Sequence, residues 1–490
     1  MPENVSFNEI PVDIRTPGQY IEIDNTKAIK GLPTQDRKLL ILGQRLTAGT
    51  VAQGVPTRVT SAAAAVGYFG RGSMLAGMIA AAKQANPYSD LWAVALDDNG
   101  AGAAATGTIT FTGSPTEAGT LKLYIGGQRL QVGVAAGEAV ATSAANTAAA
   151  INAALDLPVT ASSALGVVTL TARHKGECGN GVDVRLNYYQ GEATPKGMAV
   201  AIAAMSGGTG NPNVATAIAA LGGDQYYTIV SPWTDTSNVA ALETELATRW
   251  GPMAQKTGHA FHGLSGSHGT LTTYGAARNS PHSTFIGAYQ SPTPPYLWAA
   301  VLGAVCEYHG AIDPARPFQT LELPGLLAPQ VSARFTREER NLLLKDGIST
   351  FLVGQDGKVY IERVITTYQT NAFGVEDLSY LDLETKWTVD YIRYAVRARI
   401  ALRYPRYKLA DDGTQFAPGQ AIVTPRHIRA ELLGLFRELE AVGLVENFDQ
   451  FKDDLLVVRS NSDANRVNAV IPPDIVNQFR VFAAAIQFRL

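Results

Sequence analysis

Cysteine and histidine, which carry most metal and redox chemistry in proteins, are scarce in this chain. Its 490 residues include two cysteines, Cys178 and Cys306, and seven histidines. The cysteines lie far apart in sequence, so there is no CxxC pair, and a disulfide framework is excluded. We therefore expect a chain without cofactor or metal that is made in a reducing compartment.

Excess charge and long apolar runs are also missing. The net charge is -3 and the pI is near 6.2, which gives no reason to expect a nucleic acid or an anionic membrane as partner. No apolar run approaches the roughly 20 residues that span a bilayer. Residues 1–20 are polar and lack the apolar core of a signal peptide. The sequence predicts a soluble cytoplasmic product with no nucleic acid partner and no stable membrane association.

The composition is that of a globular protein with several cores. The chain is 46% hydrophobic and 17% charged, and its length suits two to four domains. Residues 38–310 alternate strand-like and helix-like segments, which favours a largely parallel α/β sheet covered on both faces. The predicted strands cover residues 39–43, 91–96, 226–230, 260–264 and 284–288, and the predicted helices cover residues 61–83, 213–221, 238–250 and 296–308.

The amino-acid composition changes within this α/β region. Residues 101–206 are rich in Ala, Gly and Thr, and roughly a tenth of them are charged against a usual quarter. Strand-like alternation recurs there, and Gly-rich segments flank the region on both sides. Because insertions are tolerated at surface loops, we predict a separate, mostly β domain inserted into the α/β domain. The predicted strands of this insertion include residues 108–112, 121–125, 167–171 and 182–186.

From about residue 342 the chain is more charged. Asp356-Gly357 lies between two apolar alternating runs, a strong hairpin signal. Predicted helices follow at 384–402 and 425–442, so this part is a third, α+β domain. The fold class is thus multidomain α/β and α+β with strand-like terminal extensions. The predicted domains are a 1–24 extension, an α/β domain of 25–100 and 207–341, the 101–206 insertion, and a carboxyl-terminal domain of 342–490 ending in a strand at 479–490.

Both chain ends have the pattern of strands without a local partner. Neither end has a turn signal that places it in a hairpin, so each must pair at long range in its own chain or with another chain. Three alternatives are open: the two ends pair with each other, they pair with the sheet of the third domain, or they are donated to a neighbouring subunit. The apolar residues that alternate are Ile10, Val12 and Ile14 at one end and Ile486, Phe488 and Leu490 at the other.

Two clusters suggest other chemistry. His259, His262 and His268 suggest a metal site, but the first two fall on opposite faces of a predicted strand and no HExxH motif is present. The run from Gly263 to Ser267 nearly matches the G-x-S-x-G nucleophile elbow, so Ser265 or Ser267 with His268 is the best candidate for a hydrolase. The structural alternative is a polar strand-to-helix turn.

Several segments resemble a known family. Residues 7–28, beginning Phe7-Asn8-Glu9-Ile10-Pro11-Val12, resemble the opening of Mu-like contractile phage tail sheath proteins. Residues 471–490 resemble the carboxyl terminus of that family, and residues 347–367 resemble its hairpin with a following Thr-rich strand. The resemblance covers essentially the whole chain, including an insertion at the expected place.

This resemblance implies a structural protein and not an enzyme. It implies a subunit that polymerises into a helical tube around an inner tail tube and contracts to drive that tube through the host envelope. Neighbours would exchange their terminal strands, the insertion would face outward, and the third domain would face the tube. The implied partners are other copies, the tube protein, and baseplate and tail terminator proteins, in a virion tail assembled in the bacterial cytoplasm. A phage-derived bacteriocin or another contractile injector, and from another class an α/β serine hydrolase, are the alternatives.

The basic segment 386–408 and the helix after it supply candidate tube contacts. Arg397, Arg426 and Arg429 could meet an acidic tail tube. Interleaved tyrosines in the same segment equally suit a helix packing on a core. A solvated helix face is the structural alternative for each arginine.

Overall fold

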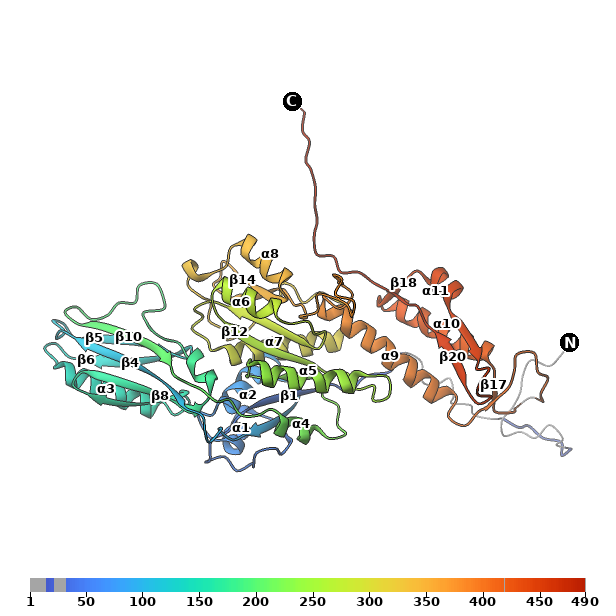
Figure 1. The fold of residues 1–490 in the computed structure, drawn as a ribbon, viewed down its shortest axis with the longest axis horizontal. Coiled ribbons are helices and arrows are strands. Elements are labelled where there is room, and N and C mark those ends of the chain that lie inside the picture. The colour runs from blue at the N-terminus through green and yellow to red at the C-terminus, as the bar shows by residue number, and fades with distance from the viewer. Residues whose placement is uncertain (1–14, 22–31, 418, 490) are drawn as a thin grey trace. The chain divides into compact units, whose positions relative to one another are not determined.

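The computed structural model describes residues 15–21, 32–417 and 419–489 (Figure 1). The described chain divides into two compact units. One comprises Arg37–Lys386, and the other comprises the described residues from Trp387 onward together with those before Arg37. Residues 10, 12, 14 and 490, which carry part of the strand prediction, lie outside the described ranges.

An eight-stranded sheet is the centre of the first unit in the described part of the chain. Its strand order is β15-β14-β13-β12-β11-β1-β3-β2, in which the six strands from β14 to β3 run parallel. The mainly parallel α/β sheet predicted from the sequence is confirmed. The strands are β1 (Lys38–Gln44), β2 (Thr57–Arg58), β3 (Asp90–Leu96), β11 (Thr228–Val230), β12 (His259–Ser265), β13 (Ser283–Ala288), β14 (Ile348–Val353) and β15 (Val359–Arg363).

Helices cover both faces of this sheet, because its central strands are apolar on both sides. Leu40 and Leu42 of β1 belong to the core formed with helices α4 and α5, while Gly43 approaches Leu75 of helix α2 on the opposite face. Helix α7 packs on that same side, where its Gly303 meets Val230. The helices are α1 (Ala62–Phe69), α2 (Met74–Ala85), α4 (Ala215–Leu221), α5 (Thr236–Trp250), α6 (His268–Ala276), α7 (Pro295–Ile312) and α8 (Arg337–Lys345).

Between β3 and α4 the chain forms two antiparallel sheets. One has the order β10-β4-β8-β7 and the other β6-β5-β9, and they share one apolar core with helix α3 (Val140–Ala153). Core residues such as Ile109, Leu123 and Leu170 lie on the predicted strands. The strands are β4 (Ala104–Thr112), β5 (Gly119–Ile125), β6 (Gln128–Val134), β7 (Val159–Ala164), β8 (Val167–Lys175), β9 (Val184–Leu186) and β10 (Ala199–Ser206).

The predicted Asp-Gly hairpin is present, but it belongs to another sheet than expected. β14 and β15 pair antiparallel around the turn, and β14 also pairs in parallel with β13, with Ile348 opposite Phe285. The hairpin therefore extends the eight-stranded sheet, and the compact unit continues to Lys386. A hairpin pattern predicts only that its two strands pair with each other. It does not predict that β14 also pairs with β13, because β13 lies far away in the sequence.

Helices dominate the second unit. Helix α9 (Leu383–Arg403) precedes α10 (Pro425–Ala441) and α11 (Phe448–Asp454), and the predicted helices at 384–402 and 425–442 are confirmed. The core of the unit includes the predicted stripe of α10, where Phe436 stacks on Phe451 with ring centroids 4.0 Å apart. Short strand pairs complete it: β16 (Lys408–Leu409) with β17 (Ile422–Val423), β18 (Val445–Glu446) with β21 (Asp474–Ile475), and β19 (Leu456–Arg459) with β20 (Val467–Val470).

Candidate functional site

The segment after β21 is extended and exposed. The Val476 amide donates to the Leu444 carbonyl at 3.2 Å, and residues 477–489 then carry no helix and no strand pairing within the described chain (Figure 1). Ile486 is 91% exposed and Phe488 is 79% exposed. The segment thus has the alternation predicted for a strand but no partner strand among the described residues.

Exposed apolar side chains are concentrated in this segment. Clustered exposed apolar groups mark interaction sites, since a monomer gains nothing from leaving them in water. Burying one such side chain contributes about 1.5–3 kcal/mol. The exposed large apolar residues here are Phe479, Val481, Phe482, Ile486 and Phe488.

The three candidate arginines have different surroundings. Arg429 donates to the carbonyls of Lys452 and Leu455, at the end of α11, so its charge caps a helix carboxyl terminus. The Arg397 guanidinium is exposed and lies 6.0 Å from the ring centroid of Tyr394. Arg426 is exposed as well, at the first turn of α10. Arg397 and Arg426 are therefore exposed, while Arg429 is half-buried and held by backbone carbonyls.

Arg399 has an internal role that the sequence pattern of its own helix does not reveal. Its side chain is 9% exposed and lies 3.0 Å from Glu431, and it also pairs with Glu438. The two carboxylates lie seven residues apart on α10, a spacing that places them on one helix face. The spacing of Glu431 and Glu438 is the feature of the sequence that could have predicted an acidic face on α10. The arginine joins α9 to α10.

The serine–histidine cluster forms a helix start. The Ser267 hydroxyl accepts from the Thr270 amide and so caps α6, while His268 Nε2 lies 3.2 Å from the Glu339 carbonyl oxygen. A nucleophile elbow needs an imidazole nitrogen on the serine hydroxyl. Here the His268 ring is held toward α8, and it packs against Phe335. The structural alternative, a strand-to-helix turn, describes this geometry.

The other two histidines are buried on opposite faces of β12, as predicted. His259 Nε2 lies 2.8 Å from Thr284 Oγ1, and His262 Nδ1 lies 3.2 Å from the Trp233 carbonyl oxygen. Burial lowers the pKa of His262 to about 3, so this imidazole is neutral. Within the described ranges, no group of three or more His, Cys, Asp or Glu side chains is arranged to hold a metal ion. In the same ranges no helix is long and apolar enough to cross a membrane.

The crevice that usually binds ligands in such sheets is partly covered by the protein itself. Strand order reverses between β1 and β11, and ligands of doubly wound sheets bind at the carboxyl ends of the strands at that point. Gln44, the last residue of β1, donates to Asp98 and to the Lys175 carbonyl, both at 2.7 Å. His174 Nδ1 lies 2.9 Å from the same Asp98 carboxylate. The end of β8 thus docks at the carboxyl ends of β1 and β3. A cavity of about 250 Å³ remains at the carboxyl ends of β11 and β12, where Pro232, Thr234 and Ser265 line it.

Comparison with known families agrees with this architecture. Three family models match in succession: the phage tail sheath protein beta-sandwich domain over residues 100–221, the phage tail sheath protein central domain over 207–367, and the phage tail sheath C-terminal domain over 375–489. The first covers the two antiparallel sheets, and the second covers most of the parallel strands.

Relatives cover nearly the full chain. The sheath tail protein of Listeria innocua has a similar fold, with a TM-score of 0.52 and 12% identity over 92% of this chain and 95% of its own. That of Desulfitobacterium hafniense gives a TM-score of 0.49 and 15% identity over 94% and 100%. The Mu-like prophage FluMu tail sheath protein of Haemophilus influenzae is 45% identical over 487 residues, which are 99% of this chain and 100% of the relative. The chain therefore belongs to the phage tail sheath protein family.

Proposed function

We propose that this chain is the repeating subunit of a contractile tail sheath, which polymerises into a helical tube around an inner tail tube. The observation that carries the proposal is the extended segment 477–489, which is exposed from Val481 onward and lies outside every sheet of the described residues. An edge of a sheet in a neighbouring copy would satisfy its backbone and cover Ile486, Phe488 and Leu490. Five residues would gain four or five backbone hydrogen bonds, each contributing about 1 kcal/mol.

The amino-terminal residues Ile10, Val12 and Ile14 are proposed to act in the same way. Two donated strands per subunit would link each copy to more than one neighbour, so the polymer becomes a mesh. Extended lead-ins let such links persist while folded units turn relative to one another. This arrangement supports a lattice with two packings of one subunit, which is what contraction requires.

Contraction is proposed to draw its free energy from new burial between subunits. With that source of free energy, the chain performs no catalysis and uses neither nucleotide nor cofactor. Ser267 caps a helix and His268 lies against a carbonyl, which supports a structural role for the cluster that most resembles a hydrolase.

Other partners follow from the same proposal. The exposed Arg397 and Arg426 are the proposed contacts to an acidic tail tube, and Arg429 adds to the same basic surface from its helix-capping position. The insertion of residues 101–206 would face outward. Baseplate and terminator proteins would close the two ends of the tube, in a virion tail assembled in the host cytoplasm. The sheath of a phage-derived bacteriocin or of another contractile injector would assemble and contract through the same contacts between subunits.

Negative-stain electron microscopy of the purified chain tests this proposal. Full-length protein should form hollow tubes or rings, and a variant lacking Ile486–Leu490 should not. A matched variant, Gln487→Ala with Arg489→Ala, keeps the apolar face and should still assemble. Uniform small particles from the full-length chain at high concentration would contradict the proposal.

A further inference from the structure

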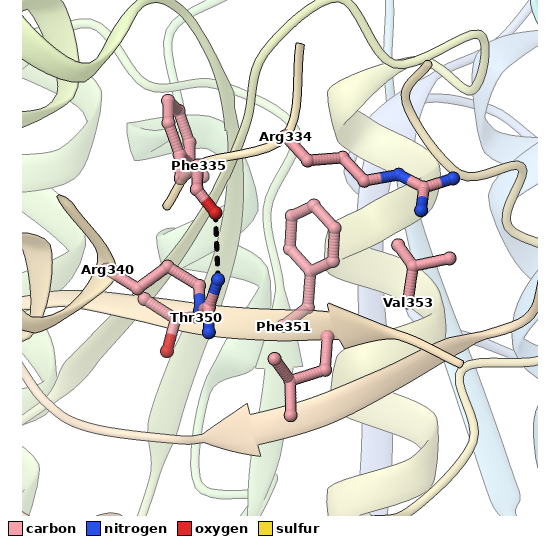
Figure 2. A pocket seen from close by; sticks show the side chains of 8 residues that line it. Arg334, Phe335, Arg340, Thr350, Phe351 and Val353 are labelled. Carbon is pink, nitrogen blue, oxygen red and sulfur yellow. Dashed lines mark hydrogen bonds between the residues drawn. The ribbon is translucent and has the colours of Figure 1, made fainter. Parts of the chain in front are cut away.

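A pocket opens at the carboxyl ends of β13 and β14. Its volume is about 140 Å³, and its walls come from these strands and from the segment leading into α8 (Figure 2). The Phe351 ring stands between two arginines, with Val353 beside it (Figure 2). The lining residues are Gly287, Arg334, Phe335, Arg340, Thr350, Phe351, Leu352 and Val353.

The two arginines differ in how far their charge is neutralised. Arg340 lies 2.8 Å from Glu362 and donates to the Phe335 carbonyl at 2.8 Å. Arg334 donates from Nε to the Pro329 carbonyl at 2.9 Å and has no carboxylate partner in the described part of the chain. The pocket therefore combines an apolar floor with one positive charge available at its rim.

A loop at the other end of the same strands has the complementary character. Residues 371–378 project between Thr370 and Tyr380, and Phe373 near the tip is 91% exposed. Val375 and Leu378 are 60% and 62% exposed. Glu376 is exposed and has no cation partner among the described residues. Three exposed apolar side chains in one short loop form a cluster of the kind that marks a contact surface.

The anchoring of this loop fixes where it lies. The Asn279 side chain donates to the Thr370 carbonyl at 2.8 Å and accepts from the Gln369 amide at 2.8 Å. Asn279 lies just before β13 begins at Ser283, so the loop is held at the amino ends of the strands. The pocket lies at their carboxyl ends, about 20 Å away for a six-residue strand.

We propose that the Phe373 loop of one copy docks into the Arg334 pocket of the next copy in the sheath polymer. A cavity of about 150 Å³ accommodates a benzene ring, so the pocket has the size for one phenyl group. Glu376 would then meet Arg334. A knob and a hole at opposite ends of one rigid unit make a head-to-tail contact, and such contacts generate rings or open helical filaments. This inference rests on the proposed polymerisation and names a contact within it that does not involve the terminal strands.

Charge reversal tests the contact in the full-length chain. Arg334→Glu alone and Glu376→Arg alone should each raise the critical concentration for tube formation about tenfold, since each puts like charges together. The two changes combined in one chain should restore assembly. The matched control is Arg337→Glu, a nearby exposed position that does not line the pocket and should leave assembly unchanged. Circular dichroism reports whether each variant is folded.

Cysteine crosslinking provides a test that does not depend on stability. Tubes assembled from Val375→Cys, Leu352→Cys protein, which keeps the Phe373 ring, should give a ladder of covalent oligomers on oxidation, while tubes of each single variant should stay monomeric on a denaturing gel. Normal tubes without a ladder, together with unchanged critical concentrations for the charge variants, would overturn the docking contact and leave the proposed function standing. Absence of tubes from the unmodified chain would instead contradict the proposed function.

Discussion

At the residue scale, the close approach of β12 to α7 depends on Gly263. A Cβ atom there would lie 2.0 Å from the Pro295 carbonyl oxygen, which is fixed backbone at the start of a helix. Gly263→Ala should therefore destabilise the first unit by about 3 kcal/mol, measured by chemical denaturation. The control Gly269→Ala, where a Cβ meets nothing within 4 Å, should be neutral or stabilising. Equal stability of the two variants would contradict this packing.

Buried His262 makes stability depend on pH. Its pKa falls from 6.5 to about 3 on folding because burial disfavours the charged ring. The unfolded chain thus binds the extra proton at a higher pH than the folded chain, so stability is lost as pH falls from 6.5 toward 3. At pH 4.5 the loss amounts to about 2–3 kcal/mol.

The denaturation midpoint of the first unit, followed from about pH 7 to about pH 4.5, checks this expectation. His262→Gln cannot titrate, so its stability should fall less over the same range. An identical pH slope in the variant and the unmodified chain would show that other groups control the acid response.

At the element scale, Arg399 is expected to join α9 and α10. Arg399→Ala removes the cation that Glu431 and Glu438 share, while Arg403 still lies 3.4 Å from Glu431, so the substitution should destabilise the second unit by about 2 kcal/mol. Arg397→Ala, two residues away on the exposed side, should change its stability by less than about 0.5 kcal/mol. Hydrogen exchange of α10 amides measures both, and faster exchange should be confined to Arg399→Ala.

The alternation of the segment 477–489 gives a second prediction at this scale. If one face of the segment is buried in a neighbouring subunit, Ile486→Asp and Phe488→Asp should each abolish tubes. Gln487→Asp carries the same charge on the opposite face and should leave them intact. Sedimentation of assembled protein separates these outcomes. Equal loss from all three variants would indicate an effect of charge and not of a strand face.

How far the sequence predicts the elements depends on how local their signals are. The α10 helix follows from its apolar stripe and from the Thr424-Pro425 start, both contained in one segment. Helix α6 is anticipated only through the strand-to-helix turn before it, and its extent cannot be predicted, because His268–Ala276 has little apolar periodicity and is held by contacts with α8 and β14. The 348–363 hairpin follows from its turn, but its place beside β13 depends on a pairing across some sixty residues of sequence.

In the candidate site too, features with a local sequence signal can be predicted, whereas features that depend on distant contacts cannot. The alternation of apolar and polar residues predicts that Ile486 and Phe488 lie on one strand face. Both side chains are exposed in the subunit, which agrees with burial of that face against another chain. The helix-capping contacts of Arg429 cannot be predicted, because the carbonyls it binds belong to a short helix with a weak sequence pattern. The Phe373 loop and the Arg334 pocket likewise become visible only when the sheet places them at opposite ends of β13 and β14.

At the scale of the whole molecule, the chain combines rigid units with extended segments. The insertion is tied to the parallel sheet through Asp98, which accepts from Gln44 and lies beside His174. We expect such internal contacts to keep each unit intact while the links between copies change. The carboxyl-terminal segment of each subunit would then form part of a sheet in the neighbouring subunit.

Strand donation between copies can be observed in a helical reconstruction of tubes formed by the purified chain. We expect residues 484–489 to lie as a β-strand hydrogen-bonded to the carboxyl-terminal domain of an adjacent copy, with Ile486 and Phe488 buried. Tubes in which this segment pairs within its own chain, or stays in solvent while subunits contact elsewhere, would contradict strand donation.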